Sequence, residues 1–219
     1  MVVWSPWQPP SGGGTGNSGN PGNGGSTDDS ISGDSGSAME TEAASFASQH
    51  IYADQLDLNN PDQRAWHNAV HNIISRAYLA AKYGATMDGP GAYNLSAAQF
   101  LQKLENTTFT MVPSGAQNPA QTNFNPSGSH ADILVSVAQV MTYEDDFGSR
   151  AAGMDYVVAH EMGHAFGWDF WKSNGYLATS PTLEAFANTM GLGIAEAMGI
   201  PYPSTSQLQG QNYGGTLPR

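Results

Sequence analysis

The segment 11–37 limits how much of this chain can enter a folded core. It reads SGGGTGNSGNPGNGGSTDDSISGDSGS and consists almost entirely of Gly, Ser, Asn, Thr and Asp. Such a segment buries too little apolar surface to offset the conformational entropy that ordering would remove. We therefore expect a disordered tether over residues 1–38 and a single folded domain over residues 39–219.

Charge and composition exclude several classes of partner. The 219 residues include 7 Lys and Arg against 19 Asp and Glu, for a net charge of −12. Nucleic acids and anionic membranes are bound by concentrated Lys and Arg, so we expect neither as a partner. The chain contains no cysteine, so disulfides and thiolate metal ligands are excluded and a transition metal would require His, Asp or Glu.

Targeting segments are not expected in this chain. No apolar run reaches the roughly 18 residues of a membrane span. The N-terminal MVVWSPWQPP lacks the basic and apolar regions of a secretory signal peptide. The compartment stays open between cytoplasmic and a secreted or delivered bacterial protein, and we take the chain as a monomer by default.

Hydrophobic periodicity predicts helices with a small sheet between them. We expect helices over 40–56 and 61–83, a short helix after Ser96, and helices over 154–166 and from Ser180 to about Gly199. Strands are expected over 108–112 and 133–140, separated by a loop at 113–130. This order of elements predicts an α+β fold with a small, mostly antiparallel sheet.

The chemistry is concentrated in the predicted helix that contains VVAHEMGHAF. His160 and His164 are four residues apart, so both imidazoles project from one face of a helix and can share one metal ion. Glu161 lies about 100° around the same helix and can reach a water on the open side of that metal. We expect one Zn²⁺ per chain, with Glu161 as general base. A helix with two incidental histidines and no metal is the structural alternative.

Two acids can complete the ligand set that a catalytic zinc requires. Glu184 follows His164 after 19 residues, in the first turns of the helix that begins at Ser180. Asp169 lies within AFGWD, directly after the second histidine. We favour Glu184, and Asn188 one turn later would share its helix face and could fix the tautomer of a ligating histidine.

The pattern HEMGH-x19-E-x-x-A-N resembles the gluzincin peptidases, and the run LEAFANTM is similar to the ligand helix of ImmA/IrrE-type zinc peptidases. The resemblance implies a zincin-like domain with an active-site helix and a second ligand helix. It also implies Glu184 as the third zinc ligand and Asn188 as a support for a zinc-bound histidine. Small residues at Gly163 and Ala187 would let the two helices approach closely.

A second resemblance is to the metzincins, whose signature places a Gly three residues after the second histidine and a third ligand three residues further on. Gly167 matches this pattern, but position 170 is Phe and Asp169 comes one residue early. The gluzincin resemblance implies a tyrosine and a further histidine that stabilise the oxyanion. No histidine follows His164, so Tyr176 is our candidate for this role.

Together these observations predict a zinc metalloendopeptidase that acts on a protein or peptide substrate, and a delivered toxin or effector protease fits the tether. We expect the strand at 131–140 to form the edge with which an extended substrate pairs. A zinc-bearing regulatory or binding module without turnover is the alternative function.

Overall fold

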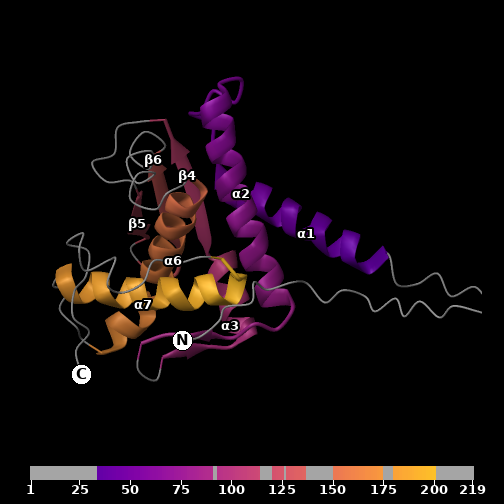
Figure 1. Ribbon diagram of the computed structural model, residues 1–219. Coiled ribbons are helices and arrows are strands. Elements are labelled where there is room, and N and C mark those ends of the chain that lie inside the picture. The colour runs from indigo at the N-terminus through magenta and orange to yellow at the C-terminus, as the bar shows by residue number, and fades with distance from the viewer. Residues whose placement is uncertain are drawn as a thin grey trace, which may run out of the picture.

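The computed structural model describes residues 34–90, 93–113, 120–125, 127–136, 150–174 and 180–200 (Figure 1). Within these residues the chain has an α+β fold. Its helices are α1 Asp34–His50, α2 Pro61–Lys82, α3 Ala97–Glu105, α6 Arg150–Asn174 and α7 Ser180–Met198. Its strands are β1 Ile51–Tyr52, β2 Met87–Asp88, β3 Asn94–Leu95, β4 Thr107–Val112, β5 Ala120–Phe124 and β6 Ala131–Ser136.

Helices α2 and α3 begin where their capping residues predict. The Asn60 side chain accepts hydrogen bonds from the backbone N–H groups of Asp62 and Gln63, and Pro61 takes the first helical position. Ser96 and Gln99 form a reciprocal capping box at the start of α3. The apolar stripe predicted for α2 is buried, with Trp66, Val70, Ile73 and Ile74 among its members.

Helix α1 differs in position from its prediction. It covers Asp34–His50 instead of 40–56, so it begins inside the segment assigned to the tether and gives way to the short strand β1 at Ile51. Ala43 and Ala47 are its fully buried side chains and face α2. The weak apolar pattern of this segment did not define where the helix begins and ends.

The main sheet is mixed, so the predicted mostly antiparallel sheet is wrong. Its strand order is β1-β4-β6-β5, in which β4 runs parallel to both β1 and β6, and β5 runs antiparallel to β6. The cause is β5, which occupies part of the predicted loop at 113–130. Because β5 returns along the outside of β6, strands β4 and β6 point in the same direction.

Strand β6 lies inside the sheet, so the predicted edge strand at 131–140 is also wrong. Residues 131–136 pair with β4 on one side and with β5 on the other, while 137–140 lie outside the described residues. Among the described strands, β5 is the outer one on this side of the sheet, and it lies next to α6. Any peptide that extends this side of the sheet would therefore pair with β5.

Helix α6 lies across one face of the main sheet, and α7 crosses α6 and also contacts the short strand β2 (Figure 1). The core side chains of α6 include Met154, Val158, Met162 and Phe166, each with no exposed surface. Helix α6 extends beyond the predicted 154–166 at both ends. Helix α7 begins at Ser180, as predicted.

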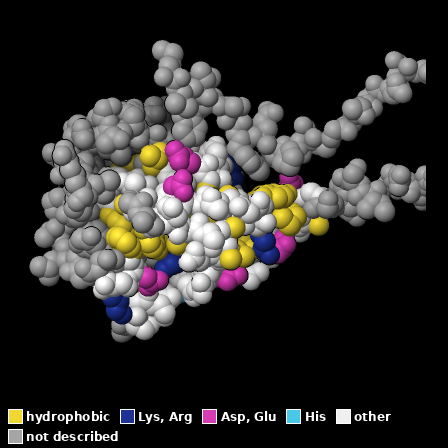
Figure 2. Space-filling model, turned by 90° about the horizontal axis from the view of Figure 1, so that it is seen from below, with side chains coloured by type: hydrophobic (Ala, Val, Ile, Leu, Met, Phe, Trp, Pro, Cys, Tyr) yellow, Lys and Arg dark blue, Asp and Glu magenta, His cyan; other side chains and the backbone are white. Residues whose placement is uncertain are grey.

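The surface shows no concentrated basic region on the face drawn in Figure 2, where the Lys and Arg side chains stand apart from one another. No helix within the described ranges combines the length and apolar character that a membrane span requires.

Candidate metal centre

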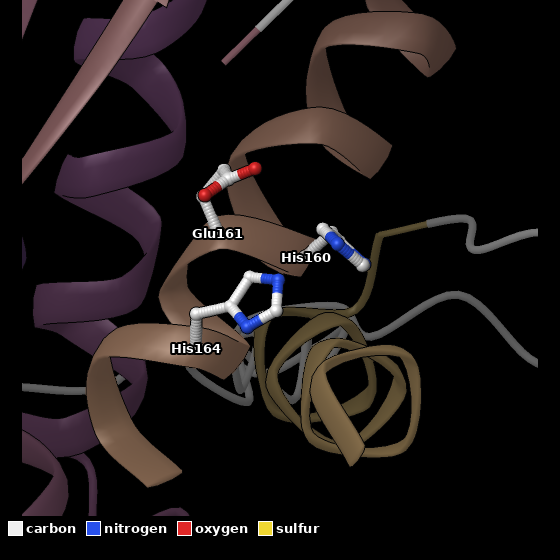
Figure 3. A group of neighbouring side chains, drawn as sticks. All are labelled: His160, Glu161 and His164. Atoms are coloured by element: carbon white, nitrogen blue, oxygen red, sulfur yellow. The ribbon is translucent and has the colours of Figure 1, made fainter. Parts of the chain in front are cut away.

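Helix α6 brings His160, Glu161 and His164 together, as their spacing predicts. Their candidate ligand atoms all lie within 4.8 Å of one another. Figure 3 shows the two imidazoles on neighbouring turns of the helix, next to α7, with the Glu161 carboxylate beside them. His160 and Glu161 are only 7% and 8% exposed, so these polar groups are held in a largely dry environment.

Helix α7 adds the carboxylate of Glu184 to both imidazoles. Its Oε2 lies 3.0 Å from Nε2 of His160, and its Oε1 lies 3.7 Å from Nε2 of His164. Two nitrogens and a carboxylate therefore converge on one point between the helices. The structure brings together the three residues expected to hold the metal.

The spacing of these donors fits a tetrahedral zinc ion. Zinc binds His nitrogen and carboxylate oxygen at about 2.0–2.2 Å, which separates neighbouring donors by about 3.3–3.5 Å in a tetrahedron. The two nitrogen–oxygen distances, 3.0 Å to Oε2 and 3.7 Å to Oε1 of Glu184, are close to that separation. An all-N/O donor set with two imidazoles also suits zinc better than calcium or magnesium.

The carboxylate of Glu184 is held in its ionised form. Burial alone would raise its pKa, but hydrogen bonds to His160 and His164 outweigh burial and hold the pKa well below its usual range. Burial likewise disfavours the charged form of His160. The hydrogen bond with Glu184 and the charges of Glu161 and Glu184 outweigh it and raise the pKa of His160. The charged carboxylates thus favour a cation at this point, whether a proton or a metal ion.

Asn188 was expected to fix the tautomer of a ligating histidine, and in the structure it contacts His160. Its Oδ1 lies 2.8 Å from Nδ1 of His160, and the hydroxyl of Tyr156 donates to the same oxygen at 3.4 Å. An amide oxygen in this position selects the tautomer with the proton on Nδ1. With His160 neutral, the Nε2 lone pair is directed at the convergence point, where a metal ion would replace the proton that otherwise links His160 to Glu184.

Thr122 contacts the proposed general base and was missed by the sequence analysis. Its hydroxyl donates to Oε2 of Glu161 at 2.6 Å and lies 3.0 Å from the backbone oxygen of the same residue. Thr122 lies on β5, within the segment predicted to be a loop. In the sequence, only the alternation of Ala120, Thr122 and Phe124 with the amides Gln121 and Asn123 was a weak sign of this strand.

A cavity of about 210 Å³ opens beside the cluster. Strand β5 lines one side of it, and α6 and α7 line the other. Glu161, His164 and Glu184 all reach its wall. The convergence point is therefore accessible to a ligand from outside, unlike a closed structural zinc site.

Asp169 is directed away from the cluster. Its carboxylate pairs with Lys103 of α3 and is 65% exposed. Because α6 continues to Asn174, Asp169 lies about 140° around the helix from His164. The metzincin-like ligand arrangement would need the chain to leave the helix after Gly167, which it does not do.

Tyr176, the candidate oxyanion donor, lies outside the described residues. Among the described tyrosines, Tyr156 is 3% exposed and contacts Asn188, so it belongs to the support of His160.

No family model, curated protein or solved structure matches this chain. The functional conclusion therefore rests on the geometry of the site itself.

Proposed function

We propose that this chain is a zinc-dependent metallopeptidase of zincin-like fold, with a gluzincin-like ligand set of His160, His164 and Glu184. The observation that carries the proposal is the convergence of these donors from two helices, with nitrogen–oxygen distances of 3.0 and 3.7 Å, beside an open cavity. Glu161 adjoins the donors without being needed as a ligand. A carboxylate beside the metal but outside its ligand set is what a hydrolytic site requires and a purely structural zinc site does not.

A zinc ion held by these donors would supply the Lewis acid that makes water nucleophilic near neutral pH. Glu161 acts as general base and accepts a proton from the water that attacks the scissile carbonyl. The same carboxyl group then donates the proton to the departing amine and returns to its ionised form. Asn188 keeps the Nε2 lone pair of His160 available through both steps.

The substrate is proposed to be an extended peptide that pairs with β5. This strand is the outer strand of the sheet and lines the cavity with Thr122 and Phe124. Backbone pairing with an edge strand binds peptides without regard to their side chains. The apolar wall made by Phe124, Trp168 and Leu183 is then the part of the cavity that can select one side chain.

Peptide cleavage by wild type and Glu161→Gln tests this function. A mixture of unstructured peptides is incubated with each protein, and the products are identified by mass spectrometry. We expect cleavage by wild type, a loss of at least about 100-fold in Glu161→Gln, and equal zinc content in both. Full activity in Glu161→Gln would contradict the mechanism. Zinc binding without cleavage by wild type would favour the regulatory alternative.

A further inference from the structure

The general base is tied to the outer strand of the sheet through one side chain, that of Thr122. Thr122 is paired with Ile133 of β6, whose side chain has no exposed surface, so the position of its backbone is fixed by the interior of the sheet. A β-branched side chain also has few allowed rotamers. The hydroxyl therefore meets Glu161 from a rigid support.

The contact with the carboxylate is the stronger of the two that Thr122 makes. A hydroxyl has a single hydrogen to donate, and two acceptors compete for it. Oε2 of Glu161 lies at 2.6 Å, within the range of charge-assisted O–H···O⁻ bonds, while the backbone oxygen lies at 3.0 Å. Within the described part of the chain, the bond from Thr122 is the only hydrogen bond to the Glu161 carboxylate.

We propose that Thr122 is a positioning residue for the general base, which holds Oε2 of Glu161 and leaves the second carboxylate oxygen to accept the proton from water. This inference rests on the proposed peptidase function. Because the backbone oxygen of Glu161 offers the partly buried Thr122 hydroxyl a second acceptor, the carboxyl can shift during proton transfer while the hydroxyl stays hydrogen-bonded. Strand β5 thus both binds the substrate and orients the base.

A double-mutant cycle tests the contact independently of activity. Thr122→Val removes the hydroxyl at nearly constant shape, and Glu161→Met removes the carboxylate at similar length. The two single variants and the double variant are unfolded in urea in the presence of a chelator, so that zinc plays no part. We expect a coupling of about tenfold in the unfolding equilibrium constant, because Thr122→Val leaves a buried charge unsatisfied only when Glu161 is present. Additive effects would overturn the proposal.

The kinetic consequence is measured on the zinc-loaded variants. For Thr122→Val we expect kcat to fall about tenfold, with KM nearly unchanged and full zinc content, and Thr122→Ser to recover most of the loss. Thr110→Val is the matched control, since it removes a hydroxyl that donates to Asp132 at 2.8 Å, on the same sheet but on β4. It should leave kcat unchanged.

Different results would contradict the role of Thr122 and the peptidase function. Unchanged kcat in Thr122→Val, with an active wild type, would overturn the role of Thr122 alone. A wild type that binds zinc but cleaves no peptide would overturn the peptidase function and with it this kinetic role. In that case the double-mutant cycle would still decide whether Thr122 holds Glu161.

Discussion

Gly163 of α6 lies directly against the backbone of Ala187 in α7. A Cβ at position 163 would come within 2.3 Å of the Ala187 carbonyl oxygen, and one at Gly167 would come within 2.0 Å of the Phe186 ring. The two helices therefore cross more closely than a Cβ at position 163 or 167 would permit. This close crossing sets the reach of Glu184 and Asn188 toward the histidines of α6.

Gly163→Ala should separate the two helices and weaken the proposed metal site. We expect a loss of about 1–3 kcal/mol in the free energy of unfolding from overpacking, measured by urea denaturation of the zinc-free protein. Zinc affinity should fall as well, because Glu184 would be displaced from His160 and His164. Gly36→Ala in α1 is the control, since a Cβ there meets nothing within 4 Å. Unaltered zinc affinity in Gly163→Ala would contradict this account of the crossing.

Removal of the Asn188 side chain should weaken zinc binding without removing a ligand. Asn188→Ala leaves Nδ1 of His160 without the acceptor at 2.8 Å. We expect zinc affinity to fall about 10–100-fold, measured by competition with a chromophoric chelator, and Asn188→Asp to retain most of it.

Thr189→Ala is the matched control for this prediction. The Thr189 hydroxyl donates to the Ala185 carbonyl of its own helix at 3.0 Å and does not contact the histidines. An equal loss of zinc affinity in Asn188→Ala and Thr189→Ala would contradict a specific role for the hydrogen bond between Asn188 and His160. It would mean that both substitutions weaken zinc binding by disturbing the packing of α7.

Asp155 of α6 makes the stability of the fold depend on pH. Burial raises the pKa of Asp155 to about 6 from an ordinary 3.8, although the charge of Arg76 opposes the shift. The folded protein then holds this proton at pH values where the unfolded chain has lost it, so the free energy of unfolding falls as pH rises from about 4 to about 6.

Asp155→Asn should therefore stabilise the zinc-free protein at pH 7 and flatten its stability profile between pH 4 and 6. Since part of the carboxyl contacts water, we expect a gain on the order of 1–2 kcal/mol at pH 7. Urea denaturation at several pH values, relative to wild type and to Asp54→Asn at an exposed position, measures the difference. A variant that is less stable than wild type at pH 7 would show that the ionised carboxylate is compensated in the folded state.

Local sequence features were sufficient to predict most of the helices and the side-chain cluster that we propose as the metal site. Asn60 and Pro61 define the start of α2, Ser96 that of α3, and the four-residue spacing of His160 and His164 predicts their common face because a helix fixes that geometry by itself. Glu184 and Asn188 could be assigned through a resemblance and a shared helix face. Both residues reach the histidines because α7 packs closely against α6 at Gly163. The small residues at this position and at Ala187 had suggested that close packing.

The sheet could not be predicted in the same way because its pairing is not local. The sequence of β5, AQTNF, contains one β-branched residue and two amides, so it has little intrinsic preference for a strand. Pairing with β6 makes it a strand, and the directions of β4 and β6 follow from its presence. Thr122, the residue that contacts Glu161, was missed for the same reason.

The central claim is that His160, His164 and Glu184 hold one zinc ion, and elemental mass spectrometry tests it most directly. Wild type, Glu184→Ala and Asp169→Ala are purified without added metal, and zinc is measured per chain. Asp169→Ala is the matched control, because it removes a carboxylate that pairs with Lys103 instead of the histidines.

We predict about one zinc per chain in wild type and in Asp169→Ala, and a loss of most of the zinc in Glu184→Ala. Full zinc occupancy in Glu184→Ala would contradict the ligand set. A wild-type protein that binds no zinc even after reconstitution would contradict the metal centre as a whole.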